Sequence, residues 1–155
     1  MNILAIDTCT EVASVTLYSA GVKTSRVLSS VEKSSGHILR LCDEVFQESG
    51  RQLNEIDLIA YSKGPGAFTG VRMCVGVVQG LSFSCNIPTI GFSTLELLGF
   101  RASKILKEEK IAIALDARMG EVYWAAYAHG AISKMKICGP EDVDCLGDDF
   151  VGVGT

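Results

Sequence analysis

ILAIDTCTEVASVTLY at residues 3–18 and IAIALDARMGEVYWAAY at residues 111–127 decide the fold of this chain. Each stretch begins with an apolar run that ends in an aspartate, Asp7 or Asp116, passes through a polar turn, and ends in a second run rich in apolar residues. The two match over about sixteen positions with one insertion, which indicates an internal repeat. A coincidental recurrence of strand, aspartate, turn and strand remains the alternative.

The residues around the first stretch predict an alternation of strands and helices. Apolar alternation or short apolar runs predict strands at residues 2–6, 13–18, 22–29, 56–61 and 88–91. Capping residues predict helix starts at Ser34-Ser35, Thr69 and Ser93, the last with Glu96 completing a capping box. The predicted order is therefore β-β-β-α-β-α-β-α.

The first two helices are expected to differ in their surroundings. The first should end at Gly50 and bury a periodic apolar face, formed by Ile38, Leu41, Cys42, Val45 and Phe46. The second lies in the longest nearly uncharged run, residues 71–88, which lacks the ~20 predominantly apolar residues of a membrane span. We expect a buried helix there and no membrane partner.

A duplicated β-β-β-α-β-α half is the plan of actin-like proteins, in which two hairpins face each other across a nucleotide. The expected fold is therefore α/β and actin-like (ASKHA, ribonuclease-H-like). Residues 1–103 would form the first half, including its helices, and residues 104–155 the start of the second. Because few residues follow the second stretch, the second half is expected to be incomplete and to lack its helices.

The charge balance bears on the kind of partner. The chain has 14 Lys and Arg against 18 Asp and Glu, a net charge of −4, which argues against a protein that binds nucleic acid on its own. A partial exception is a basic stripe at three-residue spacing, formed by Arg101, Lys104, Lys107 and Lys110. A solvated helix face is the favoured interpretation of this stripe, and contact with a polyanion is the alternative.

Cysteines and histidines bear on location and metal binding. None of the six cysteines forms a C-x-x-C pair, and residues 1–20 show no secretory leader, so we expect reduced thiols in a cytoplasmic protein that starts at Met1. The only histidines, His37 and His129, belong to no metal-binding motif, and no metal site is expected. His37 is expected to be exposed or to cap a helix.

The turn Asp7-Thr8-Cys9-Thr10 is a candidate phosphate site. Backbone N–H groups and hydroxyls in such a turn can hold an anion, while a carboxylate orients a metal-bound water. Asp7, Thr8 and Thr10 are the candidate ligands, and Asp116 is their equivalent in the second stretch. An equally good interpretation is a polar hairpin whose side chains bond to the local backbone.

The segment KGPGAFTGVR, residues 63–72, fits neither the G-x-G-x-x-G nor the Walker pattern. Its glycines indicate a close backbone approach at a strand-to-helix turn, with Phe68 projecting from the loop. Arg72 in the first helical turn opposes the helix dipole. It would therefore serve a partner, an anion or a tertiary ion pair, or it is by default a plain structural arginine. The residues that define this loop are Gly64, Pro65, Gly66, Phe68, Thr69, Gly70 and Arg72.

The helix after this loop carries a row of small residues, Gly76, Gly80 and Ser84, beside Met73, Val77 and Leu81. Small residues in one row let another helix approach closely. One interpretation is dense packing on the protein's own sheet. The other is a helical association face, which an exposed apolar patch would mark.

ILAIDTCTE, KGPGAFTGVR and DARMGEVYWAAY together resemble the bacterial TsaB (YeaZ) family of tRNA threonylcarbamoyladenosine biosynthesis. The resemblance implies a non-catalytic cytoplasmic scaffold that forms a homodimer in isolation and pairs with the catalytic paralogue TsaD. The ATPase TsaE joins the pair, which modifies adenosine 37 of tRNAs reading codons that begin with A. TsaD carries the H-x-x-x-H motif and the transfer chemistry, and tRNA is met only through the complex.

The resemblance also places the partner surface on residues 35–49 and 70–85. The interface candidates are His37, Leu41, Met73, Gly76, Val77, Gly80, Leu81 and Ser84. Asp7, Thr8 and Thr10 match the family's phosphate-1-like turn, which leaves ATP or ADP as a possible ligand in the complex. Family members usually extend further, so this chain is expected to be a fragment that still dimerises.

Two other function classes are compatible with parts of this sequence. An actin-like kinase or ATPase acting on a small molecule is the runner-up, but after Asp116 it lacks the glycine pair of a strong phosphate-2 loop. A peptidase is disfavoured, because the sequence offers neither the metal ligands nor a nucleophile with a base.

Overall fold

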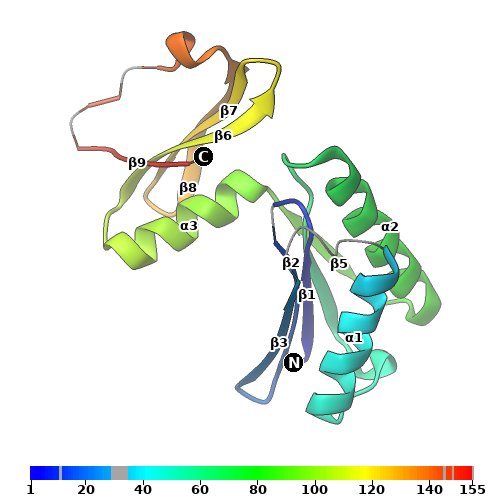
Figure 1. Ribbon diagram of the computed structural model, residues 1–155. Coiled ribbons are helices and arrows are strands. Elements are labelled where there is room, and N and C mark those ends of the chain that lie inside the picture. The colour runs from blue at the N-terminus through cyan, green and yellow to red at the C-terminus, as the bar shows by residue number, and fades with distance from the viewer. Residues whose placement is uncertain (11, 29–34, 145, 148, 155) are drawn as a thin grey trace. The chain divides into compact units, whose positions relative to one another are not determined.

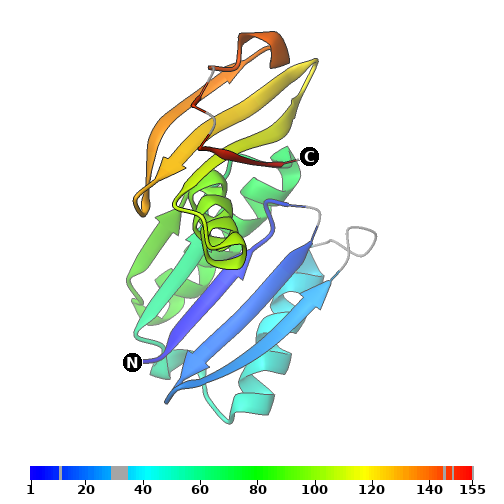
Figure 2. The same cartoon turned by 90° about the vertical axis from the view of Figure 1, so that its left-hand side faces the viewer.

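The computed structural model describes residues 1–10, 12–28, 35–144, 146–147 and 149–154 (Figures 1 and 2). The chain divides into two compact units, Met1–Phe92 and Ser93–Thr155. This division falls before the expected boundary at residue 103, because the third helix packs on the second sheet rather than on the first. Each unit is therefore described by itself.

The first unit is built on a five-stranded mixed sheet in the order β3-β2-β1-β4-β5. β1 pairs antiparallel with β2 and parallel with β4, as the predicted order requires. All five predicted strands are present with bounds shifted by a few residues, and residue 29 lies outside the described part. The bounds are Ile3–Asp7 for β1, Ala13–Ser19 for β2, Val22–Leu28 for β3, Leu58–Ser62 for β4 and Thr89–Phe92 for β5.

Helix α1, Ser35–Ser49, covers this sheet with the predicted face. Four of the five predicted residues are buried and Phe46 is partly buried against them. Gly50 ends the helix in the left-handed region at φ +64°, a conformation that glycine adopts without strain. The predicted cap residue Ser34 lies outside the described residues, and a short 3-10 turn, η2 (Leu53–Glu55), leads into β4.

Helix α2, Phe68–Cys85, differs from the prediction in two ways. Its N-cap is Ala67 rather than Thr69, so the helix begins inside the glycine-rich segment. The expectation of a buried helix was wrong, because only one row, Gly70, Cys74 and Val78, is buried. By length and composition α2 is long and apolar enough to cross a membrane. This is weak evidence for a membrane span, because core helices of soluble proteins pass the same test.

The second unit has a four-stranded sheet in the order β8-β7-β6-β9, with helix α3 on one face. Leu95 and Gly99 of α3 are buried, and the adjoining core includes Ile113 and Tyr127. The expectation that this half lacks helices is therefore corrected, since the helix that precedes the repeat covers its sheet. The bounds are α3 Thr94–Leu106, β6 Lys110–Arg118, β7 Glu121–Ala128, β8 Ala131–Cys138, η3 Pro140–Asp142 and β9 Val151–Gly154.

The two sheets repeat one topology, which supports the internal repeat over coincidence. In each, the first strand pairs antiparallel with the second, the second antiparallel with the third, and the fourth adds parallel to the first. The aspartates match as well. The Oδ1 atom of Asp7 accepts the N–H of Cys9 at 2.9 Å, and that of Asp116 accepts the N–H of Arg118 at 2.7 Å.

Residues 139–150 return the chain from β8 to β9 and are held to the sheet by charge. Lys136 Nζ donates to the Asp142 carbonyl at 2.6 Å and to Asp144 Oδ1 at 2.7 Å. Lys136 also lies 5.6 Å from the ring of Trp124, the chain's sole tryptophan. Because side chains alternate along a strand, Trp124 points away from the α3 face that Ala125 joins.

This arrangement makes Trp124 a reporter of the 139–150 segment. We expect Lys136→Gln to loosen the segment and shift the Trp124 emission to longer wavelength, because both hydrogen bonds lose a charged donor. Lys134→Gln is the matched control, since Lys134 only approaches Asp144 at 3.7 Å. We call the two hydrogen bonds from Lys136 to Asp142 and Asp144 the latch. Equal emission spectra for the two variants would show that the latch does not hold the segment.

The latch should also depend on pH. The hydrogen bond from Lys136 lowers the pKa of Asp144 below its ordinary 3.8, and the bond to Asp144 raises the pKa of Lys136 above 10.5. Because the pKa of Asp144 is lowered on folding, its ion pair stabilises the folded unit above the unfolded pKa, and this stabilisation is lost as the pH falls through the folded pKa. Because the pKa of Lys136 is raised on folding, the same ion pair stabilises the folded unit below the unfolded pKa, and this stabilisation is lost as the pH rises through the folded pKa. The Trp124 emission should thus be constant between these limits and shift beyond them.

Candidate functional site

The Asp7 turn follows the polar-hairpin interpretation in its internal bonding. Asp7 Oδ1 accepts the N–H of Cys9 and the hydroxyl of Ser62. Thr8 is fully buried, and its hydroxyl donates to the carbonyl of Gly70 at 2.6 Å. The hydroxyl of Thr10 donates to the carbonyl of Val12 at 3.2 Å. These side chains hold the turn, and phosphate binding by the turn stays a prediction.

The glycine-rich loop lies directly against this turn. Ala67 N–H donates to the carbonyl of Cys9 at 3.0 Å. A Cβ atom on Gly66 would come 2.1 Å from the Cys9 carbonyl oxygen, and one on Gly70 would come 2.2 Å from that of Thr8. The predicted close backbone approach is confirmed, and its partner is the first repeat's aspartate turn. The loop and the turn therefore form one rigid structural element of the first unit.

Phe68 projects from the loop as expected, with 72% of its surface exposed. The guanidinium carbon of Arg72 lies 3.3 Å from the centre of its ring. This cation–π contact offsets part of the cost of a cation in the first turn of a helix. Arg72 thus has the structural contact that the default interpretation requires.

The thiols beside the turn are poor nucleophiles. Cys9 and Cys74 are buried, and the Cys9 Sγ is 3.4 Å from the carbonyl of Ser62. Burial, with a smaller contribution from nearby Cys9, raises the pKa of Cys74 to about 11, so its thiolate is scarce near neutral pH. Within the described ranges, no group of three His, Cys, Asp or Glu side chains is placed to hold a metal ion.

Asp116 belongs to the second unit and lies at its own hairpin turn. Its Oδ2 is 3.7 Å from Arg118 Nη1, and Arg118 and Met119 both have positive φ values there. The structure thus gives both aspartates the same position in their repeats. Whether they share a ligand stays a prediction.

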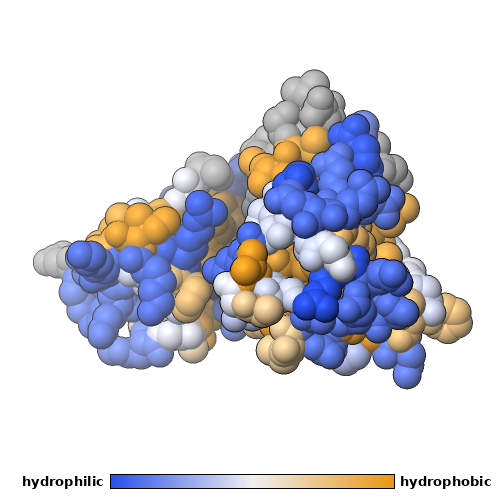
Figure 3. Space-filling model, turned by 90° about the horizontal axis from the view of Figure 1, so that it is seen from below, coloured by the Kyte–Doolittle hydropathy of each residue, from blue (hydrophilic) through white to orange (hydrophobic). Residues whose placement is uncertain are grey.

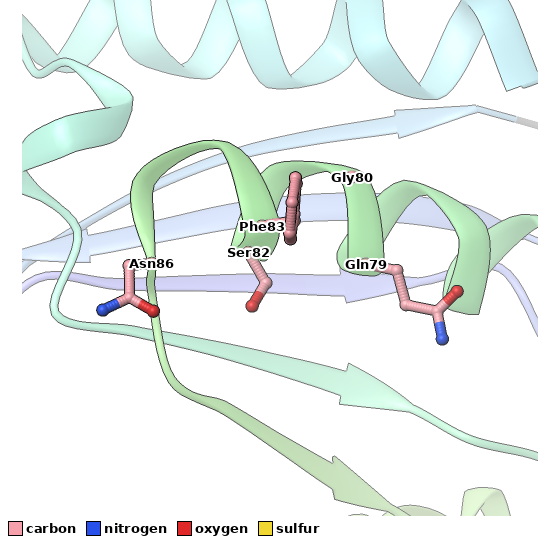
Figure 4. Close-up of a pocket in the computed structure, with 5 residues that line it drawn as sticks. All are labelled: Gln79, Gly80, Ser82, Phe83 and Asn86. Atoms are coloured by element: carbon pink, nitrogen blue, oxygen red, sulfur yellow. The ribbon is translucent and has the colours of Figure 1, made fainter.

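The outer side of α2 carries the exposed small residues. A Cβ atom on Gly76 or Gly80 would meet nothing within 4 Å, and Ser84 is exposed. Packing of this row on the protein's own sheet was therefore the wrong alternative. A shallow hollow follows the C-terminal half of the helix (Figure 4), lined by Gln79, Gly80, Ser82, Phe83 and Asn86.

The remaining interface candidates separate by burial. Leu41 is 2% exposed and belongs to the core, so its assignment to a partner surface is corrected. Met73, Val77 and Leu81 are partly buried against the same core, and His37 is partly exposed. Apolar residues at helical spacing fit a core and an interface equally well, which is why the sequence pattern did not separate them.

Two residues of this region were missed by the sequence interpretation. Phe83 is 91% exposed beside the hollow. Its spacing from Gly76 and Gly80 already places it on the same side of the helix. Ser62 binds Asp7 through its hydroxyl, a contact between residues far apart in sequence. The first had a signal in the helical period, and the second had none.

Comparisons with known proteins match a family model and several curated relatives. Residues 28–152 match the TsaD family, described as tRNA N6-adenosine threonylcarbamoyltransferase. The chain is 38% identical to the tRNA threonylcarbamoyladenosine biosynthesis protein TsaB of Escherichia coli over 100% of its own length and 71% of that protein. It is 39% identical to the protein of the same name from Haemophilus influenzae, over 81% of this chain and 53% of that protein.

Solved structures also match this chain, and YeaZ is among them. YeaZ from Pseudomonas aeruginosa superposes with a TM-score of 0.89 at 37% identity, covering 99% of this chain and 74% of that one. A ROK hexokinase from Thermus thermophilus, 10% identical with a TM-score of 0.52 over 86% of this chain and 48% of that one, shares the fold alone. The predicted α/β actin-like fold is confirmed. The chain belongs to the TsaB (YeaZ) family, whose named members are tRNA threonylcarbamoyladenosine biosynthesis proteins.

Proposed function

We propose that this chain is a non-catalytic cytoplasmic scaffold that binds the catalytic paralogue TsaD through the outer side of α2. The assembled complex, which the ATPase TsaE joins, transfers a threonylcarbamoyl group to adenosine 37 of tRNAs that read codons beginning with A. In isolation, the same surface holds two copies of the chain together.

The observation that carries this proposal is the exposed row of small residues beside an exposed aromatic ring. Gly76 and Gly80 leave open space above the helix, so a partner helix can approach closely. Phe83 stands beside the hollow with 91% of its surface exposed. Aromatic side chains are common anchors at the centre of interfaces, and here the ring is adjacent to a hollow that a partner side chain can fill.

The turn chemistry fits an accessory role better than the runner-up, an actin-like kinase or ATPase. A nucleotide phosphate at the first turn would have to compete with the internal bonds of Asp7 and Thr8. ATP or ADP in the complex stays a prediction. It is tested separately by calorimetry with the chain alone and with the chain bound to TsaD.

The test is light scattering coupled to size exclusion, with the chain alone and after addition of TsaD. We expect a homodimer that converts to a one-to-one complex. Gly80→Arg should weaken both associations by about 30-fold, because a long charged side chain would occupy the close-approach row. Gly80 has open space around it, so the variant should fold.

Val22→Arg is the matched control. Val22 lies on the edge strand β3 of the same unit and is 65% exposed, so the same charged side chain is added away from α2. It should leave both associations unchanged. A chain that stays monomeric at micromolar concentration and ignores TsaD would contradict the proposal.

A further inference from the structure

The basic stripe on α3 is the sequence feature that the scaffold proposal leaves unused. Arg101, Lys104 and Lys107 are exposed, and none of them has a carboxylate within 4.0 Å among the residues described. Lys110, the fourth member predicted from the spacing, forms an ion pair with Asp149. The structure therefore reduces the stripe to three cations, two in α3 and Lys107 at its C-cap.

The rest of the basic residues behave differently. Most described cations outside α3 lie beside a carboxylate: Arg26, Arg40, Arg51, Lys110, Arg118, Lys134 and Lys136. Among the described residues, Lys23 on β3 and Lys63 in the glycine-rich loop each stand singly without an ion pair, and Arg72 is stacked on Phe68. In a chain with a net charge of −4, α3 and its C-cap are thus where three unpaired cations gather among the described residues. Over two steps of three residues the stripe extends about 9 Å along the helix.

An aromatic ring accompanies these cations. Phe100 is 54% exposed, and Lys104 Nζ lies 5.5 Å from the centre of its ring. From below, the second unit presents a hydrophilic area beside a hydrophobic patch at the left of Figure 3. Surfaces that bind RNA combine cations for the phosphates with exposed aromatic rings on which bases stack.

We propose that Phe100, Arg101, Lys104 and Lys107 form a contact surface for the tRNA backbone within the assembled complex. This inference rests on the proposed function, because three cations are too few to hold RNA on an acidic chain alone and become effective when a partner also binds the tRNA. An acidic protein surface is the other polyanion. The exposed ring among the cations favours RNA.

The experiment measures tRNA binding by the complex of the full chain with TsaD, using fluorescence anisotropy at several salt concentrations. Lys104→Gln with Lys107→Gln should lower the slope of log K against log salt by about 1.4 to 1.8, and the affinity at low salt by about tenfold. Phe100→Ala should weaken binding without changing the slope. Lys23→Gln is the control and should behave as the unchanged chain does.

Complex formation is followed in the same samples by size exclusion. An intact complex with an unchanged salt slope would overturn the RNA surface while leaving the scaffold proposal in place. Loss of the complex in the double variant would show that the stripe binds a protein instead. If the unchanged chain fails to bind TsaD, the proposed function fails and this inference fails with it.

Discussion

Gly70→Ala should destabilise the first unit by about 3–4 kcal/mol, among the largest effects expected of a single substitution. The added methyl group would stand 2.2 Å from the carbonyl oxygen of Thr8, and that atom is backbone rather than the end of a flexible side chain. Movement is resisted from both sides, since the Thr8 hydroxyl donates to the Gly70 carbonyl at 2.6 Å. Relief of the clash would therefore break a buried hydrogen bond.

Gly76→Ala is the matched control, because it makes the same chemical change in the same helix. Its Cβ would meet nothing within 4 Å, so the change should stabilise the unit by about 0.5–1 kcal/mol through helix propensity. The measurement is urea unfolding, monitored through hydrogen exchange of the amides of β1, β4 and α2, at concentrations where the chain is monomeric. Equal midpoints for the two variants would show that the loop and the turn are not rigidly joined.

Gly66→Ala separates the two contacts of the loop. Its Cβ would lie 2.1 Å from the Cys9 carbonyl oxygen, which also accepts the Ala67 N–H. A loss similar to that of Gly70→Ala would show that both sides of the turn are needed. The family motif would then owe its glycines to folding of the first unit rather than to direct contact with a ligand.

Much of the first unit follows from sequence because its signals are local. The alternation of residues 13–18 and the period of α1 depend on neighbours two to four residues away, and both predictions hold. The aspartate turns were also predictable, because the repeat marks them twice. In each case the residues that decide the structure lie within one element or one turn.

The errors arose where distant residues decide. Leu41 and the row at Met73 are apolar, and only the sheet beneath them determines that they face inward rather than toward a partner. Lys110 was wrongly counted among the unpaired cations of the basic stripe, because it pairs with Asp149, which is 39 residues away in the sequence. Likewise α3 follows the first sheet in sequence but packs on the second, since Gly99 fits against Tyr127 there.

That last contact gives the second large prediction. Gly99→Ala should destabilise the second unit by about 2–3 kcal/mol, because the new methyl group would lie 2.5 Å from Cγ of Tyr127, which is 2% exposed. The ring is buried, so it cannot turn away without disturbing the core. Trp124 lies three residues before Tyr127 on β7, so its fluorescence reports unfolding of this unit.

A double-mutant cycle decides whether the ring causes the loss. In a Tyr127→Gly background the three nearest atoms, Cγ, Cβ and Cδ2 of Tyr127, are all gone, so Gly99→Ala should there cost nothing and instead gain about 0.5–1 kcal/mol from helix propensity. If Gly99→Ala is equally harmful in both backgrounds, the contact with Tyr127 is not what holds α3 to the sheet. If the cost vanishes, the glycine is what lets a helix from outside the repeat complete the second unit, and with it sets the orientation of the basic stripe.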